Sequence, residues 1–254
     1  MARTPSPNPS DAEVADVFCY LKRHFEVKDV LPDELDYIYI LESPHVYELI
    51  FRKPLSGASG ENFSRQLTQG THTVPFGLYH REEGNLPLPT ALAKIGVMNI
   101  CPFPLQSKPY GPGGSQLLAA MQDVLQALNV IRGSQNFDTV HISGWARKLK
   151  PMILTDFRDR LHGIPLSEPG SGSHPEQRQE NRRVTSTTAS GSASQTREMT
   201  SPSQDENHPP EPVKIRACGT FAEMFVNKLD DDGEIPRQLR IIRPRLDHPS
   251  LWTE

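Results

Sequence analysis

The sequence predicts an α/β fold with a mostly parallel, helix-flanked sheet, because strand-like and helix-like segments alternate along the chain. Short apolar segments of strand length recur, and segments with apolar residues three and four positions apart separate them. Polar residues stand directly after several of the apolar segments. In parallel sheets, ligands bind at the carboxyl ends of the strands, so these polar residues are candidates for a functional site.

The first half of the chain contains one capped helix and two strands. Ser10-Asp11-Ala12-Glu13 is a capping box, in which Ser10 and Glu13 satisfy free N–H groups at a helix start. Residues 36–41 (DYIYIL) and 95–100 (IGVMNI) predict two buried strands. The apolar residues that follow the capping box recur at helical spacing and are Val14, Val17, Phe18, Leu21 and Phe25.

The second half continues the alternation. Ser115 caps a predicted helix, and a further helix follows Gly144, which we expect to be interrupted near Pro151 because proline lacks a backbone N–H. The apolar face of the helix after Ser115 consists of Leu117, Leu118, Met121, Val124, Leu125 and Leu128. The remaining predicted elements are strands at 138–143, 213–217 and 238–243 and a helix at Phe221–Leu229.

One polar segment accounts for much of the low apolar content of the chain. Apolar residues make up 36 % of the 254 residues, but residues 167–212 contain only four of them. This segment cannot bury enough apolar area to offset its ordering entropy, so we predict that it is a disordered insertion. We expect residues 1–9 to be a disordered tail, and residues 10–166 and 213–254 to form a single domain.

Composition also excludes several classes of protein. No apolar run approaches the roughly 18 residues that cross a bilayer, and the N-terminal residues MARTPSPNPS contain no signal-peptide core. We therefore expect an intracellular protein, cytoplasmic or nuclear, that is not secreted, does not bind a membrane and is a monomer. The three cysteines are dispersed, which excludes a disulfide framework and a CxxC metal site. The net charge of −4 argues against a broad nucleic-acid coat but not against a local basic groove.

Three chemically useful side chains follow three different predicted strands. Glu42 follows the first strand, Asn99 ends the second, and His248 follows the last. If the sheet is parallel, the carboxylate, the amide and the imidazole all face one cleft. A carboxylate can orient a water and stabilise a cationic sugar, and an imidazole can donate to a departing oxygen. The amide offers both a donor and an acceptor to the edge of a base.

These motifs together resemble the uracil-DNA glycosylase superfamily, in particular the branch with GEAPG, PFxGxxG and HPS motifs. The matching segments are Leu41-Glu42-Ser43-Pro44-His45, Pro54–Gly60, Asn99, the turn from Gly144 to Ala146, and His248-Pro249-Ser250. The resemblance spans about residues 36–252 without the insertion. It implies a three-layer sandwich with a central, mostly parallel four-stranded sheet. It also implies hydrolysis of the N-glycosidic bond of uracil or another deaminated base in DNA, as in base-excision repair, with no cofactor and no metal.

The resemblance also implies roles for individual residues. Glu42 is expected to orient the attacking water, and His248 to stabilise the leaving base. The expected base-binding residues are Asn99, Pro44, His45 and Leu55. The expected DNA-backbone or wedge residues are Gly57, Gly60, Ser250, Leu251 and Trp252, and Arg237, Arg240, Arg243 and Arg245 are candidates for a DNA track.

The sequence departs from the branch at several positions. Leu41 and His45 replace glycines, and Leu55 replaces the phenylalanine that stacks on the base, so either Phe63 or Phe103 stacks instead or stacking is weak. Three dispersed cysteines also cannot hold the iron–sulfur cluster of the branch. These departures keep open a catalytically inactive member of the fold that binds nucleic acid or a partner protein. An unrelated α/β hydrolase using Glu42 or His45 with His248 is a third interpretation, although the chain lacks a GxSxG turn.

Overall fold

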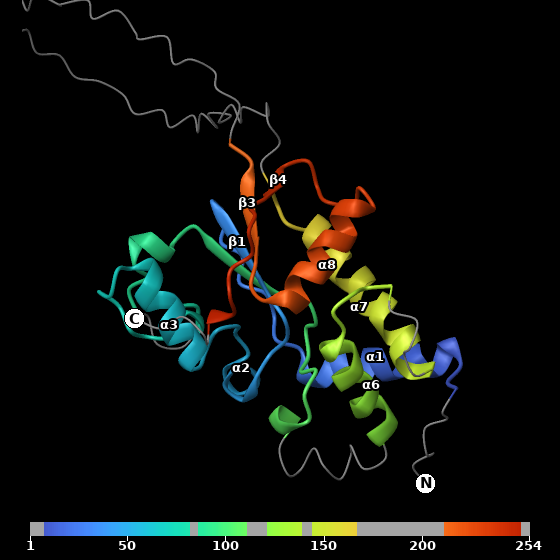
Figure 1. The fold of residues 1–254 in the computed structure, drawn as a ribbon. Coiled ribbons are helices and arrows are strands. Elements are labelled where there is room, and N and C mark those ends of the chain that lie inside the picture. The colour runs from blue at the N-terminus through green and yellow to red at the C-terminus, as the bar shows by residue number, and fades with distance from the viewer. Residues whose placement is uncertain (1–7, 82–85, 111–120, 139–143, 167–210, 250–254) are drawn as a thin grey trace, which may run out of the picture. The chain divides into compact units, whose positions relative to one another are not determined.

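A computed structural model of the chain describes residues 8–81, 86–110, 121–138, 144–166 and 211–249. Contacts divide the chain into two units, Met1–Leu166 with Pro212–Glu254, and Ser167–Glu211. All of the described helices and strands belong to the first unit (Figure 1). Most of the predicted tail and insertion, residues 1–7 and 167–210, lies outside the described residues, so their disorder stays a prediction.

Four parallel strands form the sheet at the centre of this unit. They are β1 (Tyr37–Leu41), β2 (Ile95–Asn99), β3 (Val213–Ala217) and β4 (Leu239–Ile241). Their order is β2-β1-β3-β4, and every neighbouring pair is parallel. The predicted α/β class with a mostly parallel sheet is therefore confirmed. The strand predicted at 138–143 falls outside the described residues, apart from Asp138, which lies in a turn.

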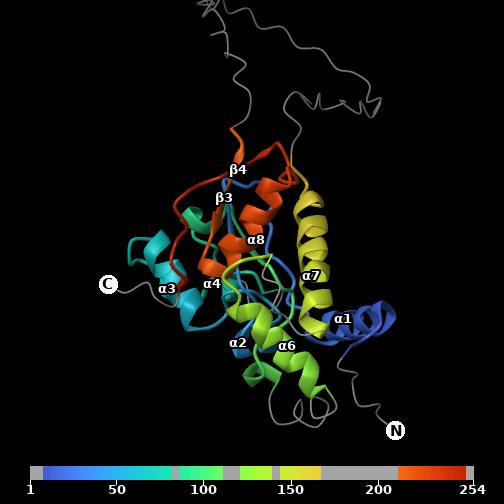
Figure 2. The ribbon, with the colours of Figure 1, turned by 45° about the vertical axis from the view of Figure 1, so that its right-hand side comes forward.

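Helices cover both faces of the sheet, which gives three layers. Figure 1 and Figure 2 show α7 and α8 in the helical layer on one side of the sheet, and α3 on the opposite side of the sheet. The alternation of β1 explains the layers, since Ile38 and Ile40 pack into one apolar core while Tyr39 and Leu41 pack into the other. The first core includes α1 (Asp11–Phe25), α6 (Gln122–Gly133), α7 (Gly144–His162) and α8 (Thr220–Asp231). The second includes α3 (Ala58–Leu67), α4 (Phe76–Tyr79) and the 3-10 turn η1 (Thr90–Leu92).

Two short elements complete the described fold. Helix α2 (Val46–Phe51) begins shortly after β1, and the 3-10 turn η2 (Lys108–Tyr110) packs near it. The capping box of α1 forms as predicted, because Ser10 Oγ accepts the Glu13 N–H at 3.2 Å and the Glu13 carboxylate accepts the Ser10 N–H at 2.8 Å. Within the part of the chain that the structure describes, helices are too short or too polar to cross a membrane.

One helix prediction is wrong and another is only partly covered. We expected an interruption near Pro151, but α7 runs without a break from Gly144 to His162. Residues on both sides of the exposed Pro151, including Leu149, Ile153 and Phe157, bury one face of α7 in the first core. This packing outweighs the loss of one helical hydrogen bond. The predicted start at Ser115 lies outside the described residues, and the described helix begins at Gln122.

Candidate functional site

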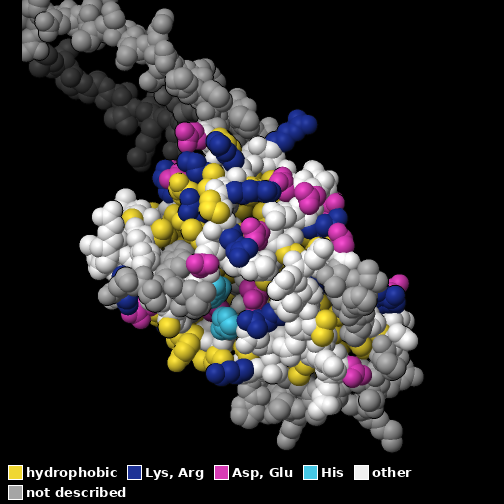
Figure 3. Space-filling view, in the orientation of Figure 1, with side chains coloured by type: hydrophobic (Ala, Val, Ile, Leu, Met, Phe, Trp, Pro, Cys, Tyr) yellow, Lys and Arg dark blue, Asp and Glu magenta, His cyan; other side chains and the backbone are white. Residues whose placement is uncertain are grey.

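A cleft of about 690 Å³ opens at the carboxyl ends of the strands. Its wall includes Glu42 after β1, Cys218 and Gly219 after β3, and His248 after β4. His45, which precedes α2, also lines it. Figure 3 shows histidine side chains gathered beside acidic and basic side chains on this face. The structure thus brings the predicted residues Glu42, His45 and His248 to one cleft.

The backbone around Glu42 is held by the neighbouring strand. β2 continues its hydrogen bonds past Asn99, since the Ile100 N–H donates to the Leu41 carbonyl at 2.9 Å and the Cys101 N–H donates to the Glu42 carbonyl at 3.1 Å. The Glu42 side chain is only 17 % exposed, and its Oε1 lies 2.5 Å from Nε of Arg132, at the end of α6. Glu42 is therefore a fixed carboxylate whose ion-pair partner comes from a distant helix.

His248 reaches the cleft because the chain after β4 continues to pair with β3. Leu246 donates its N–H to the Ala217 carbonyl at 3.0 Å, and its own carbonyl accepts the Gly219 N–H at 2.8 Å. Gly219 has φ of 90°, a conformation that favours glycine, and a Cβ there would lie 3.9 Å from His248 Cβ. This pairing places the His248 imidazole, which follows β4 in the chain, beside the end of β3.

Burial keeps the two cleft histidines neutral. Their ring centroids are 6.2 Å apart and the rings are nearly perpendicular. Burial, together with the charges of His45 and Arg132, lowers the pKa of His248 to about 4. Burial and Arg132 also lower the pKa of His45, although Glu42 opposes them. At neutral pH each uncharged ring can therefore donate from one nitrogen and accept at the other.

A buried carboxyl ties His45 to the loop that contains Leu55. Glu48 Oε2 accepts the His45 N–H at 2.6 Å, and Oε1 accepts the Leu55 N–H at 2.5 Å. Burial raises the pKa of Glu48 to about 7, and the two backbone donors only partly oppose this rise. Leu55 is held in the left-handed region with φ of 55°. Glu48 thus joins two segments that both contain predicted site residues.

Several residues predicted to contact the base or the DNA backbone pack against other parts of the protein instead. Leu55 is buried in the second core and does not line the cleft. A Cβ at Gly60 would lie 1.7 Å from the Leu55 carbonyl oxygen, so packing within the loop already requires glycine there. A Cβ at Gly57 would lie 3.0 Å from the Tyr47 ring, and Pro44 is buried. None of these four residues lines the cleft.

The two aromatic residues considered for stacking on a base are both core residues. Phe63 is fully buried and packs edge-on against Tyr39 and Phe76. Phe103 is also fully buried and packs edge-on against Phe18. The expectation that one of them stacks on a base in this cleft is therefore wrong, because their faces are used by the cores. The other expected contacts, Ser250, Leu251 and Trp252, lie outside the described residues.

Asn99 ends β2 as predicted, but its side chain does not line the cleft. It is fully buried, and neither its Oδ1 nor its Nδ2 has a hydrogen-bond partner within the described residues. Such an amide costs free energy unless a ligand or a water satisfies it. The expectation that Asn99 faces the same cleft as Glu42 and His248 is therefore wrong, because its amide is buried outside that cleft.

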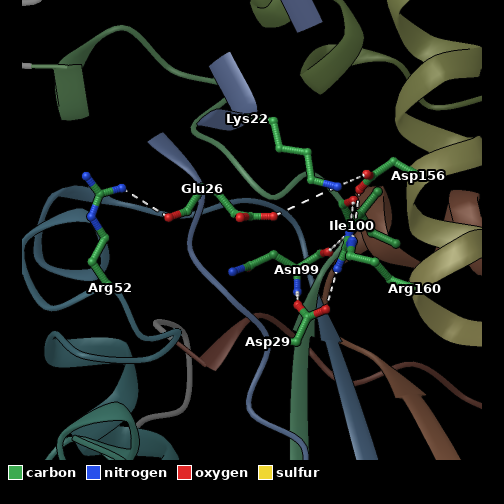
Figure 4. Close-up of polar contacts among 8 residues, drawn as sticks. All are labelled: Lys22, Glu26, Asp29, Arg52, Asn99, Ile100, Asp156 and Arg160. Carbon is green, nitrogen blue, oxygen red and sulfur yellow. Dashed lines mark hydrogen bonds and ion pairs between the residues drawn. The ribbon is translucent and has the colours of Figure 1, made fainter. Parts of the chain in front are cut away.

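A buried charge cluster fixes the backbone of Asn99 (Figure 4). Arg160 on α7 donates from Nη2 to the carbonyls of Asn99 at 2.7 Å and Ile100 at 2.8 Å. Its Nη1 lies 2.6 Å from Oδ2 of Asp29, and the other oxygen of Asp29 accepts the Asn99 N–H at 3.3 Å. Asp156 pairs with Nε of Arg160 at 2.9 Å. The cluster therefore holds the end of β2 through its main chain.

The proposed DNA track is exposed but partly engaged in ion pairs. Arg237, Arg240, Arg243 and Arg245 are all exposed. Arg243 lies 2.9 Å from Asp230, and Arg245 pairs with Glu223, both on α8. Arg245 also lines the cleft.

The sequence did not single out four residues that line or support the cleft. We expect the turn from Gly144 to Ala146 at a strand end; residues 139–143, which precede it, lie outside the described residues, Gly144 begins α7, and Trp145 and Ala146 are buried. The turn that lines the cleft is Cys218–Gly219, which could have been found by applying the strand-end rule to residues 213–217. Burial raises the pKa of Cys218 to about 12, so the thiol stays protonated and is a poor nucleophile. Arg132 and Glu48 carried no sequence signal.

Among the described residues, no three His, Cys, Asp or Glu side chains group in a way that could hold a metal ion. Comparisons of the chain with protein-family models, with curated protein sequences and with solved structures find no match.

Proposed function

We propose that this protein is a DNA glycosylase-like hydrolase that removes uracil or another deaminated base from DNA. The observation that carries the proposal is the meeting of Glu42 and the neutral His248 in one cleft at the carboxyl edge of a parallel sheet. The motif resemblance implies complementary roles for these two residues. Their convergence is what that assignment requires.

The proposed reaction hydrolyses the bond between the sugar carbon and the base nitrogen. Glu42 orients a water toward the sugar carbon and stabilises the positive charge that develops as the glycosidic bond breaks. The base departs with the bonding electrons, and the neutral imidazole of His248 donates a hydrogen bond to its oxygen. Water supplies the hydroxyl of the abasic sugar, and its remaining proton neutralises the departing base.

The test is cleavage of synthetic DNA. Single- and double-stranded oligonucleotides containing uracil, hypoxanthine or xanthine are incubated with the protein, and abasic sites are scored. We expect product with at least one base, and a loss of about 10²-fold or more in Glu42→Gln and in His248→Ala. Glu34→Gln and His24→Ala are matched controls, since both lie outside the cleft. Lack of product with every base would refute the proposal, and full activity in both cleft variants would refute the role assignments.

A second candidate is a member of the same fold that binds DNA without cutting it. The Glu42–Arg132 ion pair favours it, because one carboxylate oxygen already has a strong partner. Leu55 also favours it, because this replacement for the stacking phenylalanine is buried in the second core. Binding of a uracil-containing oligonucleotide without any abasic product would support this candidate.

A further inference from the structure

We propose that Arg132 is a positioning residue of this cleft, which holds the Glu42 carboxylate in place and presents a fixed positive charge to the two neighbouring imidazoles. The proposal rests on the function proposed above and adds a residue to it that neither the motifs nor the comparisons assign. Arg132 would act through Glu42 and His248 and would not contact the reacting atoms.

The position of Arg132 is fixed by the helix that carries it. α6 buries Val124, Leu128 and Ile131 in the first core, and Arg132 follows in the last turn. An arginine in the last turn of a helix commonly interacts with the helix dipole and remains in solvent. Arg132 instead contacts a carboxylate 90 residues earlier in the chain and lines the cleft. A helix-dipole role alone does not account for this contact.

The segment after Arg132 is anchored by a buried lysine. Lys150 on α7 donates from Nζ to the carbonyls of Asn136 at 2.9 Å and Phe137 at 2.8 Å. The same Nζ lies 4.7 Å from the centroid of the Phe137 ring. Gly133, Ser134 and Gln135, which lie between Arg132 and this anchor, also line the cleft. The wall that carries the guanidinium is therefore held at both of its ends.

The contact itself restricts the carboxylate. Nε of Arg132 lies 2.5 Å from Oε1 of Glu42, and the Glu42 side chain is largely buried while 43 % of the Arg132 side chain is exposed. A charge-assisted hydrogen bond of this kind is stronger than a neutral one and selects one side-chain orientation. Oε2 lies outside the ion pair, so a water could still be oriented by it. Misplacing such a group by about 1 Å can cost about 10²-fold in rate.

Arg132 also acts on the histidines. The titratable and charged side chains that line the cleft are Glu42, His45, Arg132, Cys218, Arg245, Asp247 and His248. Of the two arginines, Arg245 pairs with Glu223, whereas the charge of Arg132 acts on both rings. A positive charge disfavours a second one nearby, so Arg132 helps to lower the pKa of His45 and of His248. One guanidinium thus contacts the Glu42 carboxylate and also disfavours a positive charge on either imidazole.

The first test does not depend on activity. The imidazole signals of His45 and His248 are titrated by NMR in the full-length wild type, in Arg132→Met and in Arg132→Lys. We expect both titration midpoints to move to higher pH in Arg132→Met, and to return toward the wild-type values in Arg132→Lys, which restores the charge. Arg158→Met, which removes an arginine outside the cleft, should leave both midpoints in place. Unchanged midpoints in a folded Arg132→Met would overturn the proposal.

The second test separates positioning from DNA binding. In the cleavage assay, Arg132→Met should lower kcat by about 10-fold to 10²-fold with little change in KM, and Arg132→Lys should recover part of the loss. A raised KM with unchanged kcat would instead identify Arg132 as a DNA contact and overturn the positioning role. If the wild type cleaves no base, the proposed function fails while the NMR titrations still decide whether Arg132 controls the imidazoles.

Discussion

At the level of single residues, the surroundings of Glu48 change its pKa. It accepts one backbone N–H with each carboxylate oxygen and is almost completely buried. The two hydrogen bonds favour its ionised form, but burial favours the neutral form more strongly, which raises the pKa of Glu48 from its ordinary 4.5 to about 7. Glu48 therefore couples the stability of the fold to pH in the near-neutral range.

The direction of this coupling can be tested. Because the unfolded chain loses the Glu48 proton near pH 4.5 and the folded protein near pH 7, Glu48 lowers the free energy of unfolding as pH rises between these values. The expected loss is about 3 kcal/mol, fully present above pH 7 and absent below pH 4.5. In Glu48→Gln this contribution should disappear. Urea unfolding at pH 5 and pH 7 measures the difference, with Glu61→Gln as the matched control for loss of one charge. An equal pH 5 to pH 7 difference in wild type and Glu48→Gln would contradict the prediction.

Site residues can be predicted from the sequence where a reactive polar side chain lies beyond the end of a strand. Glu42 and His248 are predicted because ligands bind at the carboxyl ends of parallel strands and because both belong to the matching motifs, and the fold brings both to one cleft. Arg132 could not be found in this way, since an arginine near a helix end is ordinary and its carboxylate partner is 90 residues away. Leu55 and Gly60 matched a motif, but their positions are explained by contacts with each other. Local sequence does not reveal such contacts.

At the level of elements, α7 is tied to the sheet by charges as well as by apolar packing. Arg160 lies between Asp29, Asp156 and the carbonyls that end β2, and Lys22 of α1 pairs with the same Asp156 (Figure 4). All four donor contacts of the Arg160 guanidinium are to groups of other segments or of the preceding helical turn. Removing the Arg160 side chain would leave the buried carboxylates of Asp29 and Asp156 with less positive charge nearby to balance them.

We predict that Arg160→Met destabilises the protein by about 3–5 kcal/mol, because burial of an unpaired charge is costly. The matched control is Arg158→Met, two residues away on the same helix, whose partners Asp159 and Glu234 are more exposed and whose loss should cost much less. Chemical unfolding followed by circular dichroism measures both variants. Similar losses in the two would show that the cluster has no special contribution.

The elements themselves were largely predictable, with failures where tertiary contacts decide. Predicted strands at 36–41, 95–100, 213–217 and 238–243 correspond to β1, β2, β3 and β4. β1 and β2 are short apolar runs bounded by turns, as buried parallel strands are, whereas β3 and β4 alternate apolar and basic residues. The continuity of α7 through Pro151 was not predictable, because the buried face that holds both halves belongs to the first core. Propensity describes the isolated helix, and the core determines the observed one.

At the level of the whole molecule, the cleft and the first residue of β3 lie at opposite ends of the sheet. The cleft lies beyond the carboxyl ends of β1, β3 and β4, whereas the residues that follow the insertion enter β3 at its first residue, Val213. β3 also pairs with both β1 and β4, so the chain returns from the insertion into the middle of the sheet. The sheet order thus joins residues from both sides of the insertion.

We therefore predict that residues 167–210 can be replaced by a short Gly/Ser linker without loss of the fold. A shorter loop has a smaller closure entropy, so the free energy of unfolding should stay equal or rise by about 1 kcal/mol. Thermal unfolding and the cleavage assay measure the effect. A Gly/Ser linker of the original length separates the effect of length from that of sequence. Loss of cooperative unfolding in both linker variants would show that the segment belongs to the folded domain.

The interior position of β3 has a consequence for a chain cut within residues 167–210. One fragment would contain Glu42 and Arg132, and the other would contain β3, Gly219 and His248. Neither fragment includes a complete cleft, and the first lacks the strand that β1 needs on one side. The proposed glycosylase activity would then require the two fragments to associate, so fragments fused to two interacting proteins would form a split reporter whose signal is an abasic site in DNA.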